Sequence, residues 1–231
     1  MAASLAMIAR LFWQTFIWLA CVGVLLFGAA GTLRWPAGWI YLAEMGALGL
    51  AGGFWLARHD PDLLRERLSP LIQPTQVASD RLLVAALILS YGAWHVLMGL
   101  DAKRFGLWHF PLWLRILGAL LIALSMYVGL LTFRENSFAA PVVKVQRERG
   151  HRVITTGPYR IVRHPMYAGA LLMFVGAPLL LCSLWGLIAV PVMIVVLGTR
   201  IGIEERTLRT NLEGYTEYMQ RVPYRLIPFV W

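Results

Sequence analysis

Apolar runs separated by short polar segments dominate the pattern of this chain. Four of the runs are long enough to cross a bilayer, which takes about 20 helical residues. They cover Leu11–Leu33, Ala37–Ala57, Leu82–Leu100 and Leu112–Thr132. A fifth run, Met166–Thr199, is too long for one crossing and short for two, and we expect a turn near its middle, at Cys182–Gly186. The pattern therefore predicts about six transmembrane helices, the last two forming a short helical hairpin.

The composition agrees with a membrane protein and argues against a soluble domain. Of the 231 residues, 59% are hydrophobic and only 14% are charged, whereas a soluble domain usually carries about a quarter of charged residues. No polar segment is long enough to fold separately in water. We therefore predict an all-α integral membrane protein with a single domain, 1–231, in which 1–133 forms four N-terminal transmembrane helices.

The basic residues are divided unevenly between the two sides of the predicted bundle. With the N-terminus inside, 17 of the 21 Lys and Arg residues fall on the inner side. The other four are Arg34, Lys103, Arg104 and Arg115. Because cytoplasmic loops carry the excess of positive charge, this division predicts an even number of crossings with both termini cytoplasmic. The net charge of +9 then reflects topology and contact with anionic membrane lipids, and we expect no nucleic-acid partner.

Polar residues collect in three segments, each beside the end of an apolar run. They are 134–154 with the basic run KVQRERGHR, 157–169 with the sequence GPYRIVRHPMYAG, and 200–208 with RIGIEERTL, followed by EGYTEYMQRVPYRLIP at 213–228. In the predicted topology all of them lie at one membrane face and can converge there. A helix that continues from the hairpin into water places Arg200 and Glu204 on one face, four residues apart. An isolated surface ion pair of this kind contributes little to stability, so its position beside a dense polar loop suggests a function.

These motifs, joined by a short hydrophobic hairpin, resemble the isoprenylcysteine carboxyl methyltransferase family and its phospholipid methyltransferase relatives. The resemblance runs from about Val142 to the C-terminus, and the first four spans match only in hydrophobic character and rough placement. It implies a membrane-embedded enzyme that binds S-adenosylmethionine at the cytosolic face and takes a lipophilic acceptor from the bilayer. It also implies that 134–231 is the cofactor-binding catalytic region. No obligate protein partner is implied.

The resemblance further implies roles for particular residues. The cofactor site falls on His151, Arg152, Val153, Ile154, Tyr159, His164, Pro165, Met166, Tyr167 and Glu204. Arg200 corresponds to the ligand of the substrate carboxylate. One more cofactor contact falls on Lys144, for which Gln146 is the alternative. We expect no metal ion, because the five histidines show no HxH or HxxxH spacing and no cysteine partner.

The chemistry of these side chains suits the groups of S-adenosylmethionine. Glu204 can bind its ammonium group, and Arg152 or the N–H groups of the loop can bind its carboxylate. Tyr159 and Tyr167 can pack on the adenine or lie near the sulfonium, which favours aromatic faces. Val153 and Ile154 would wall the adenine while their backbone groups bind its edge.

An arginine is the side chain that methyl transfer to a carboxylate most needs. The carboxylate is already ionised at neutral pH, so it requires no base, only correct position and a cation that does not abolish its nucleophilicity. Arg200 is the first candidate for this catalytic role and Arg163 is the second.

Two other classes of protein stay open at this stage. Membrane sterol reductases share an Arg-His-Pro-x-Tyr element and use NADPH. A membrane scaffold or transport subunit would instead need ionisable residues deep in its spans, where Glu44 is the clear candidate. Among methyltransferases, the acceptor could be an isoprenylcysteine-like carboxylate, a phospholipid amine or a small thiol.

Overall fold

Helices form all of the regular structure in the described part of the chain. A computed structural model describes residues 4–71, 73 and 78–231, and within these residues it contains helices and no strand. The first half comprises α1 (Leu5–Ala30), α2 (Pro36–His59), the short α3 (Pro61–Arg67) and α4 (Ala78–Gly99), which continues as a π-helical turn, Leu100–Phe105. The second half comprises α5 (Leu112–Glu135), α6 (Pro165–Leu181), α7 (Leu184–Ile188), α8 (Val190–Asn211) and α9 (Tyr215–Arg221). The all-α membrane fold predicted from the sequence is thereby confirmed.

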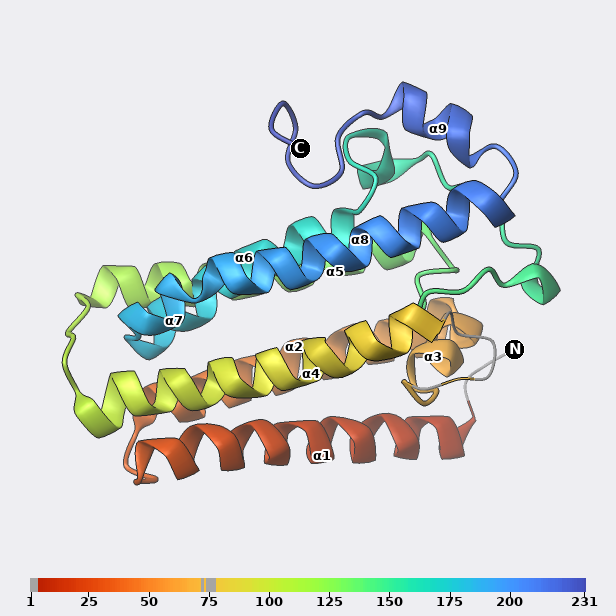
Figure 1. Ribbon diagram of the computed structural model, residues 1–231. Helices are drawn as coiled ribbons and strands as arrows, with labels where there is room; N and C mark the ends of the chain where they lie inside the picture. Colours follow the sequence, from red (N-terminus) through yellow and green to blue (C-terminus); the bar gives the residue numbers. More distant parts are fainter. Residues whose placement is uncertain (1–3, 72, 74–77) are drawn as a thin grey trace.

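The long helices run side by side as a bundle (Figure 1). Five described helices are long and apolar enough to cross a membrane, namely Leu5–Ala30, Pro36–His59, Asp80–Phe105, Leu112–Glu135 and Leu184–Asn211. The sixth, α6, is apolar but only 17 residues long. The first turn of α1 and the last turn of α8 lie at the same end of the bundle (Figure 1), as an even number of passages requires.

The turn predicted at Cys182–Gly186 lies where the structure reverses direction. Helix α6 ends at Leu181, and Cys182 adopts a left-handed backbone with φ of 63°. Ser183 then caps α7 by accepting a hydrogen bond from the Gly186 N–H. The buried Asp101 fastens this turn, since its Oδ2 accepts from the Ser183 hydroxyl at 2.8 Å and from the Trp185 N–H at 2.9 Å. Helix α8, the second helix of the hairpin, continues past the apolar run to Asn211. This agrees with the prediction that a helix extends from the hairpin into the polar segment 200–208.

Helices α5 and α6 approach one another closely because glycines lie at their contact. A Cβ atom on Gly118 would lie 2.4 Å from the backbone nitrogen of Leu180, and one on Gly176 would lie 2.7 Å from the Gly118 oxygen. Distances below 3.0 Å do not occur for real Cβ atoms, so both positions require glycine. This contact fixes α6 on α5, and the N-terminal end of α6 thereby obtains a defined position.

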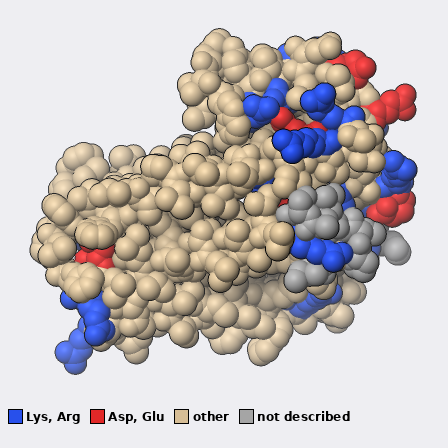
Figure 2. Space-filling view, in the orientation of Figure 1, with Lys and Arg blue, Asp and Glu red and all other residues tan. Residues whose placement is uncertain are grey.

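Charged side chains gather at the two ends of the molecule. Figure 2 shows most of them at the end that carries α3, α9 and the loop between α5 and α6, with a smaller group at the opposite end and an uncharged band between them. The outer surface of the band carries large apolar side chains such as Phe16, Leu89, Leu120 and Val195. The end with most of the charge is the one where the three polar segments of the sequence meet.

Candidate functional site

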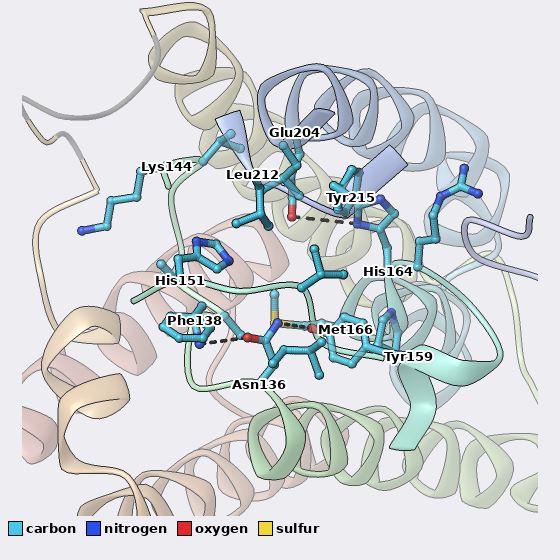
Figure 3. A pocket seen from close by; sticks show the side chains of 18 of the residues that line it. Asn136, Phe138, Lys144, His151, Tyr159, His164, Met166, Glu204, Leu212 and Tyr215 are labelled. Carbon is cyan, nitrogen blue, oxygen red and sulfur yellow. Dashed lines mark hydrogen bonds and ion pairs between the residues drawn. The ribbon is translucent and has the colours of Figure 1, made fainter. Parts of the chain in front are cut away.

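A pocket opens at the highly charged end of the bundle, where the α5–α6 loop, the start of α6, the end of α8 and α9 meet (Figure 3). All the residues that the sequence analysis assigned to cofactor, substrate or catalysis line it. These are Lys144, His151, Arg152, Val153, Ile154, Tyr159, Arg163, His164, Pro165, Met166, Tyr167, Arg200 and Glu204. The fold therefore brings the predicted set together from three separate segments of the chain, while the role of each residue stays a prediction.

Glu204 on α8 presents a carboxylate to this pocket. Its Oε2 accepts a hydrogen bond from the Tyr167 hydroxyl at 2.7 Å, and its Oε1 lies 3.9 Å from Nδ1 of His164. The side chain keeps 26% of its surface exposed. In Figure 3 the carboxylate points into the pocket toward His164. An acidic group that is oriented on one side and open on the other can accept an ammonium group.

Glu205, the next residue, points to a different region and is almost entirely enclosed, with 4% of its surface exposed. Its Oε1 accepts from Nε of Arg163 at 2.7 Å and lies 3.2 Å from Nε2 of His164, and its Oε2 accepts from Nε of Arg225 at 2.9 Å. The imidazole of His164 thus lies between the two carboxylates. Glu205 ties α8 to the start of α6 and to the C-terminal segment.

Arg163 completes this internal network. Besides the bond to Glu205, its Nη1 donates to the carbonyl oxygens of Val222 and Pro223, each at 2.8 Å. The backbone N–H groups of Arg163 and His164 also donate to the carbonyls of Tyr224 and Arg225. The guanidinium is therefore occupied in holding the segment after α9, which leaves Arg200 as the better placed of the two catalytic candidates.

The lower wall of the pocket is built around Asn136, which directly follows α5. Its Nδ2 donates to the Tyr159 hydroxyl at 2.7 Å and its Oδ1 accepts from the Phe138 N–H at 2.9 Å (Figure 3). The ring of Phe138 stacks on that of His151, with centroids 4.5 Å apart. Burial raises the pKa of Tyr159, so its phenol is neutral and can donate or accept hydrogen bonds.

Two further features make this wall suitable for a heterocycle. Burial, with the charge of Arg149 acting in the same direction, lowers the pKa of His151 to about 4, so its imidazole is neutral near pH 7. The backbone groups of Val153 and Ile154 make no hydrogen bond with any other described residue. Neutral aromatic surfaces beside free backbone donors and acceptors can hold an adenine ring by its faces and its edge.

Lys144 and Gln146, the two alternatives for one cofactor contact, already have protein partners. Nζ of Lys144 forms an ion pair with Glu66 at 2.6 Å and donates to Oε1 of Gln73 at 3.0 Å. In Figure 3 its side chain extends away from Glu204. Gln146 is fully buried, donates to the Phe138 carbonyl at 2.9 Å and accepts from Arg149. Lys144 lines the pocket and joins its loop to α3, and the amide of Gln146 holds the loop internally.

Sequence reasoning missed several residues that line the pocket. They are Asn136, Phe138, Ala139, Ala140, Val142, Val143, Leu208, Leu212, Tyr215 and Tyr218. The aromatic residues of α9 fall in a segment that the sequence analysis recognised as rich in potential ligands, so a signal existed for them. Asn136 and Phe138 belong to no motif, and the available indications were their place in the polar segment 134–154 and their position just after a transmembrane helix.

A second cavity, of about 240 Å³, adjoins the first one. Met166, Tyr167, Arg200 and Ala140 line both spaces. Arg200 donates from Nη2 to the Pro141 carbonyl, its Nε lies 3.6 Å from Oδ1 of Asp80, and its guanidinium lies 5.9 Å from the centre of the Tyr167 ring. The start of α6 and Arg200 on α8 therefore stand at the junction of two binding spaces.

Comparison with known proteins connects the pocket to one family. Residues 113–213 match the family model described as phospholipid methyltransferase. This part of the chain is similar to that family. The phospholipid methyltransferase segment contains α5 to α8 and most of the residues that line the pocket, whereas α1 to α4 lie outside it.

Two of the individual relatives are methyltransferases, in agreement with the family match, and a third is a reductase. The chain is 40% identical over 91 residues to Protein-S-isoprenylcysteine O-methyltransferase B of Arabidopsis thaliana, which covers 38% of this chain and 46% of that protein. It is 33% identical over 122 residues to Protein-S-isoprenylcysteine O-methyltransferase of Saccharomyces cerevisiae, a match that covers 50% of this chain and 49% of that protein. It is 31% identical over 132 residues to the Delta(14)-sterol reductase of Mus musculus, a match that covers 49% of this chain and 31% of that protein. The chain thus spans about half the length of the isoprenylcysteine methyltransferases it matches, and the resemblance seen in the sequence is confirmed.

Proposed function

We propose that this protein transfers a methyl group from S-adenosylmethionine to the carboxylate of a lipophilic acceptor, such as an isoprenylcysteine-like compound, at the cytosolic face of a membrane. The observation that carries this proposal is the junction of two spaces at Tyr167 and Arg200. One space is lined by groups suited to the donor, and the other joins a cationic side chain to apolar walls. The names of the isoprenylcysteine methyltransferase relatives support the choice of a carboxylate.

The side chains of the first pocket fit S-adenosylmethionine, which supplies an activated methyl group on its sulfonium. Glu204 would bind the ammonium group, oriented for this by the Tyr167 hydroxyl. Arg152 would bind the carboxylate, and the free backbone groups of Val153 and Ile154 would bind the edge of the adenine. His164, Pro165 and Met166 complete the wall on the α6 side.

The residues at the junction would position the acceptor rather than activate it. An ionised carboxylate needs no general base, so the chain must only hold it in line with the methyl group and keep water out. Arg200 can do this because it lines both spaces and its Nη1 donates to none of the described residues. Arg163 would act indirectly, by fixing His164 and the C-terminal segment around the pocket.

The site would face the cytosol, with both ends of the chain on that side. The support is the excess of Lys and Arg residues at the end that carries the pocket, which agrees with the preference of cytoplasmic loops for positive charge (Figure 2). Single cysteines introduced at Ser4 and at Arg225 test this. A membrane-impermeant reagent should label both from the same side, and labelling from opposite sides would contradict the proposed topology.

Ligand binding decides between this proposal and the second candidate, an NADPH-dependent reductase. The second candidate rests on the similarity to the Delta(14)-sterol reductase. Calorimetry on the purified protein in detergent should show binding of S-adenosylmethionine and none of NADPH. The reverse result would replace the methyltransferase proposal by the reductase. A transfer assay with methyl-labelled cofactor over carboxylate, amine and thiol acceptors then identifies the substrate class.

A further inference from the structure

Arg67, at the end of α3, is a second arginine beside the proposed acceptor site. It lines the second cavity together with Arg200. It belongs to the charged connection between α2 and α4, outside the phospholipid methyltransferase segment, and no motif singled it out. The cavity therefore has one guanidinium on the α8 side and another on the α3 side.

The contacts of Arg67 hold its guanidinium in place while leaving donors unused. Nη1 donates to the Ala139 carbonyl at 3.0 Å and lies 3.9 Å from the sulfur of Met166. The guanidinium lies 4.5 Å from the centre of the Phe133 ring, which is a cation–π geometry. Nε and Nη2 donate to none of the described residues. The side chain is thus oriented by α5, α6 and the loop, with free N–H groups left to bind a ligand.

The charge of Arg67 is not balanced by an acidic partner in the part of the protein that the structure describes. No described acidic side chain lies within ion-pair distance of it, whereas its neighbours Arg65 and Glu66 are paired with Asp62 and Lys144. Burial lowers the pKa of Arg67 to about 10, and the positive charge of Arg200 acts in the same direction against an opposing contribution from Tyr167. The group is still protonated near pH 7. A partly buried cation without a carboxylate partner is a favourable position for an anion.

The remaining walls of the cavity are apolar and lead toward the outside of the bundle. They include Leu71, Val84, Leu87 and Ile88, three of them on α4. Val84 is buried, but Ile88 keeps 54% of its surface exposed within the uncharged band of the molecule. An occupant with an anionic head and an apolar chain could therefore place its head between the arginines and its chain along α4 toward the lipid.

We propose that Arg67 and Arg200 together hold the carboxylate of the acceptor, and that Arg67 sets the preference for acidic over neutral acceptors. Asp80 offsets part of the charge of Arg200, because the two groups lie 3.6 Å apart. Arg67 has no such partner among the described residues and supplies the positive charge that a single carboxylate would neutralise. This inference rests on the proposed methyl transfer and adds the determinant of substrate class.

The test compares Arg67→Gln with Arg65→Gln, a matched change on the same short helix. Arg65 lies two residues before Arg67, is exposed, forms an ion pair with Asp62 and does not line the cavity. Direct binding of radiolabelled N-acetyl-S-farnesylcysteine is measured in competition with its neutral carboxamide, alongside methyl transfer and S-adenosylmethionine binding. Arg67→Gln should reduce the preference for the carboxylate over the carboxamide by about tenfold or more, as expected for the loss of a charge-assisted contact, and should leave the Kd of S-adenosylmethionine unchanged. Arg65→Gln should match the wild type in every readout.

Arg67→Lys keeps the charge and covers the case in which Arg67→Gln fails to fold. It should retain part of the preference for the carboxylate, since lysine lacks the planar fork of arginine. A folded Arg67→Gln protein with the wild-type preference overturns the inference, and so does an Arg67→Lys protein that loses S-adenosylmethionine binding and acceptor binding together. Selective acceptor binding without any methyl transfer refutes the proposed function but supports the role of Arg67. A wild-type protein that binds neither acceptor overturns both.

Discussion

The end of α8 presents adjacent acidic residues to two different regions of the molecule. Glu204 faces the pocket, keeps a quarter of its side chain exposed and, among the described residues, has Tyr167 and His164 as its close polar partners. Glu205 faces the C-terminal segment and is enclosed by Arg163, His164 and Arg225. Successive helical residues point about 100° apart, so one turn of helix can serve two purposes. The comparison teaches that an acidic group surrounded by its own cations fixes the architecture, whereas one left partly open is available to a ligand.

The largest expected effect is on the Glu205 side. Glu205→Gln removes the negative charge that compensates Arg163 and Arg225, and breaking a buried ion pair in this way typically costs about 3–5 kcal/mol of stability. Thermal unfolding in detergent should show a clear drop in Tm. Arg206→Gln, a change at the exposed neighbour, should leave Tm nearly unchanged. A Glu205→Gln protein as stable as the wild type would mean that the network does not hold the C-terminal segment.

The next effect is on the Glu204 side and concerns binding rather than stability. Glu204→Gln should weaken S-adenosylmethionine binding by about 1.5–3 kcal/mol, the value for one hydrogen bond to a charged group. Its Tm in the absence of ligand should stay close to that of the wild type, because Arg163 and Arg225 pair with Glu205 and not with this carboxylate. Calorimetry and unfolding on the same preparations measure both quantities. A Glu204→Gln protein that loses stability but keeps its affinity for S-adenosylmethionine would contradict the proposed difference between Glu204 and Glu205.

Arg200 lies one helical turn before Glu204. Its substitution tests whether this face of α8 binds the acceptor through Arg200 and S-adenosylmethionine through Glu204. Arg200→Ala should raise the acceptor KM or lower kcat by about tenfold, the equivalent of one lost charge-assisted contact, with little change in the Kd of S-adenosylmethionine. Arg200→Lys should restore only part of the activity because it cannot offer a two-pronged fork. If the acceptor is neutral, Arg200→Ala will be nearly silent in turnover. Complete loss of S-adenosylmethionine binding would instead assign Arg200 to the cofactor.

The fold was predictable wherever the sequence carries a periodic or compositional signal. The long apolar runs, the reversal at Cys182 and the helical continuation at Arg200 all appear in the structure, with the bounds of α1, α2, α4 and α5 within six residues of the first four predicted runs. The short helix α3 was not anticipated, because a mixed-charge segment with prolines has no distinctive period. Its Asp60 cap, which accepts from the Leu63 N–H, is a local signal that only the structure makes evident.

The candidate site was predictable in membership but not in the partners of each residue. Charge suggested that Glu204 serves the pocket, yet nothing in the sequence indicated that Glu205 is the more deeply buried of the two acids. Nor did it indicate that Arg163 and Lys144 find their partners within the protein, because those partners lie 42 and 78 residues away in the chain. Long-range ion pairs depend on how helices meet, which hydrophobic periodicity does not specify.

The smallest expected effect concerns His151 on the far wall of the pocket. Its pKa of about 4 lies below the ordinary value of 6.5, so between these values the unfolded chain binds a proton that the folded protein does not. The stability that the folded protein gains by keeping His151 neutral is fully present above pH 6.5 and is lost as the pH falls toward 4. Wild-type Tm should therefore drop more between pH 7.5 and pH 5 than that of His151→Gln. Equal drops would show that His151 is more hydrated than its surroundings indicate.

The length of α6 has a consequence for the lipid around the protein. Seventeen residues extend about 26 Å, less than the roughly 30 Å of a typical hydrocarbon core. One way in which a membrane accommodates a span shorter than the bilayer is local thinning. The N-terminal end of α6 carries Met166 and Tyr167, so the locally thinned membrane would lie beside the junction of the two cavities. The headgroups of neighbouring lipids and acceptors would then lie closer to the site. An acceptor would have to move a shorter distance out of the lipid in order to react.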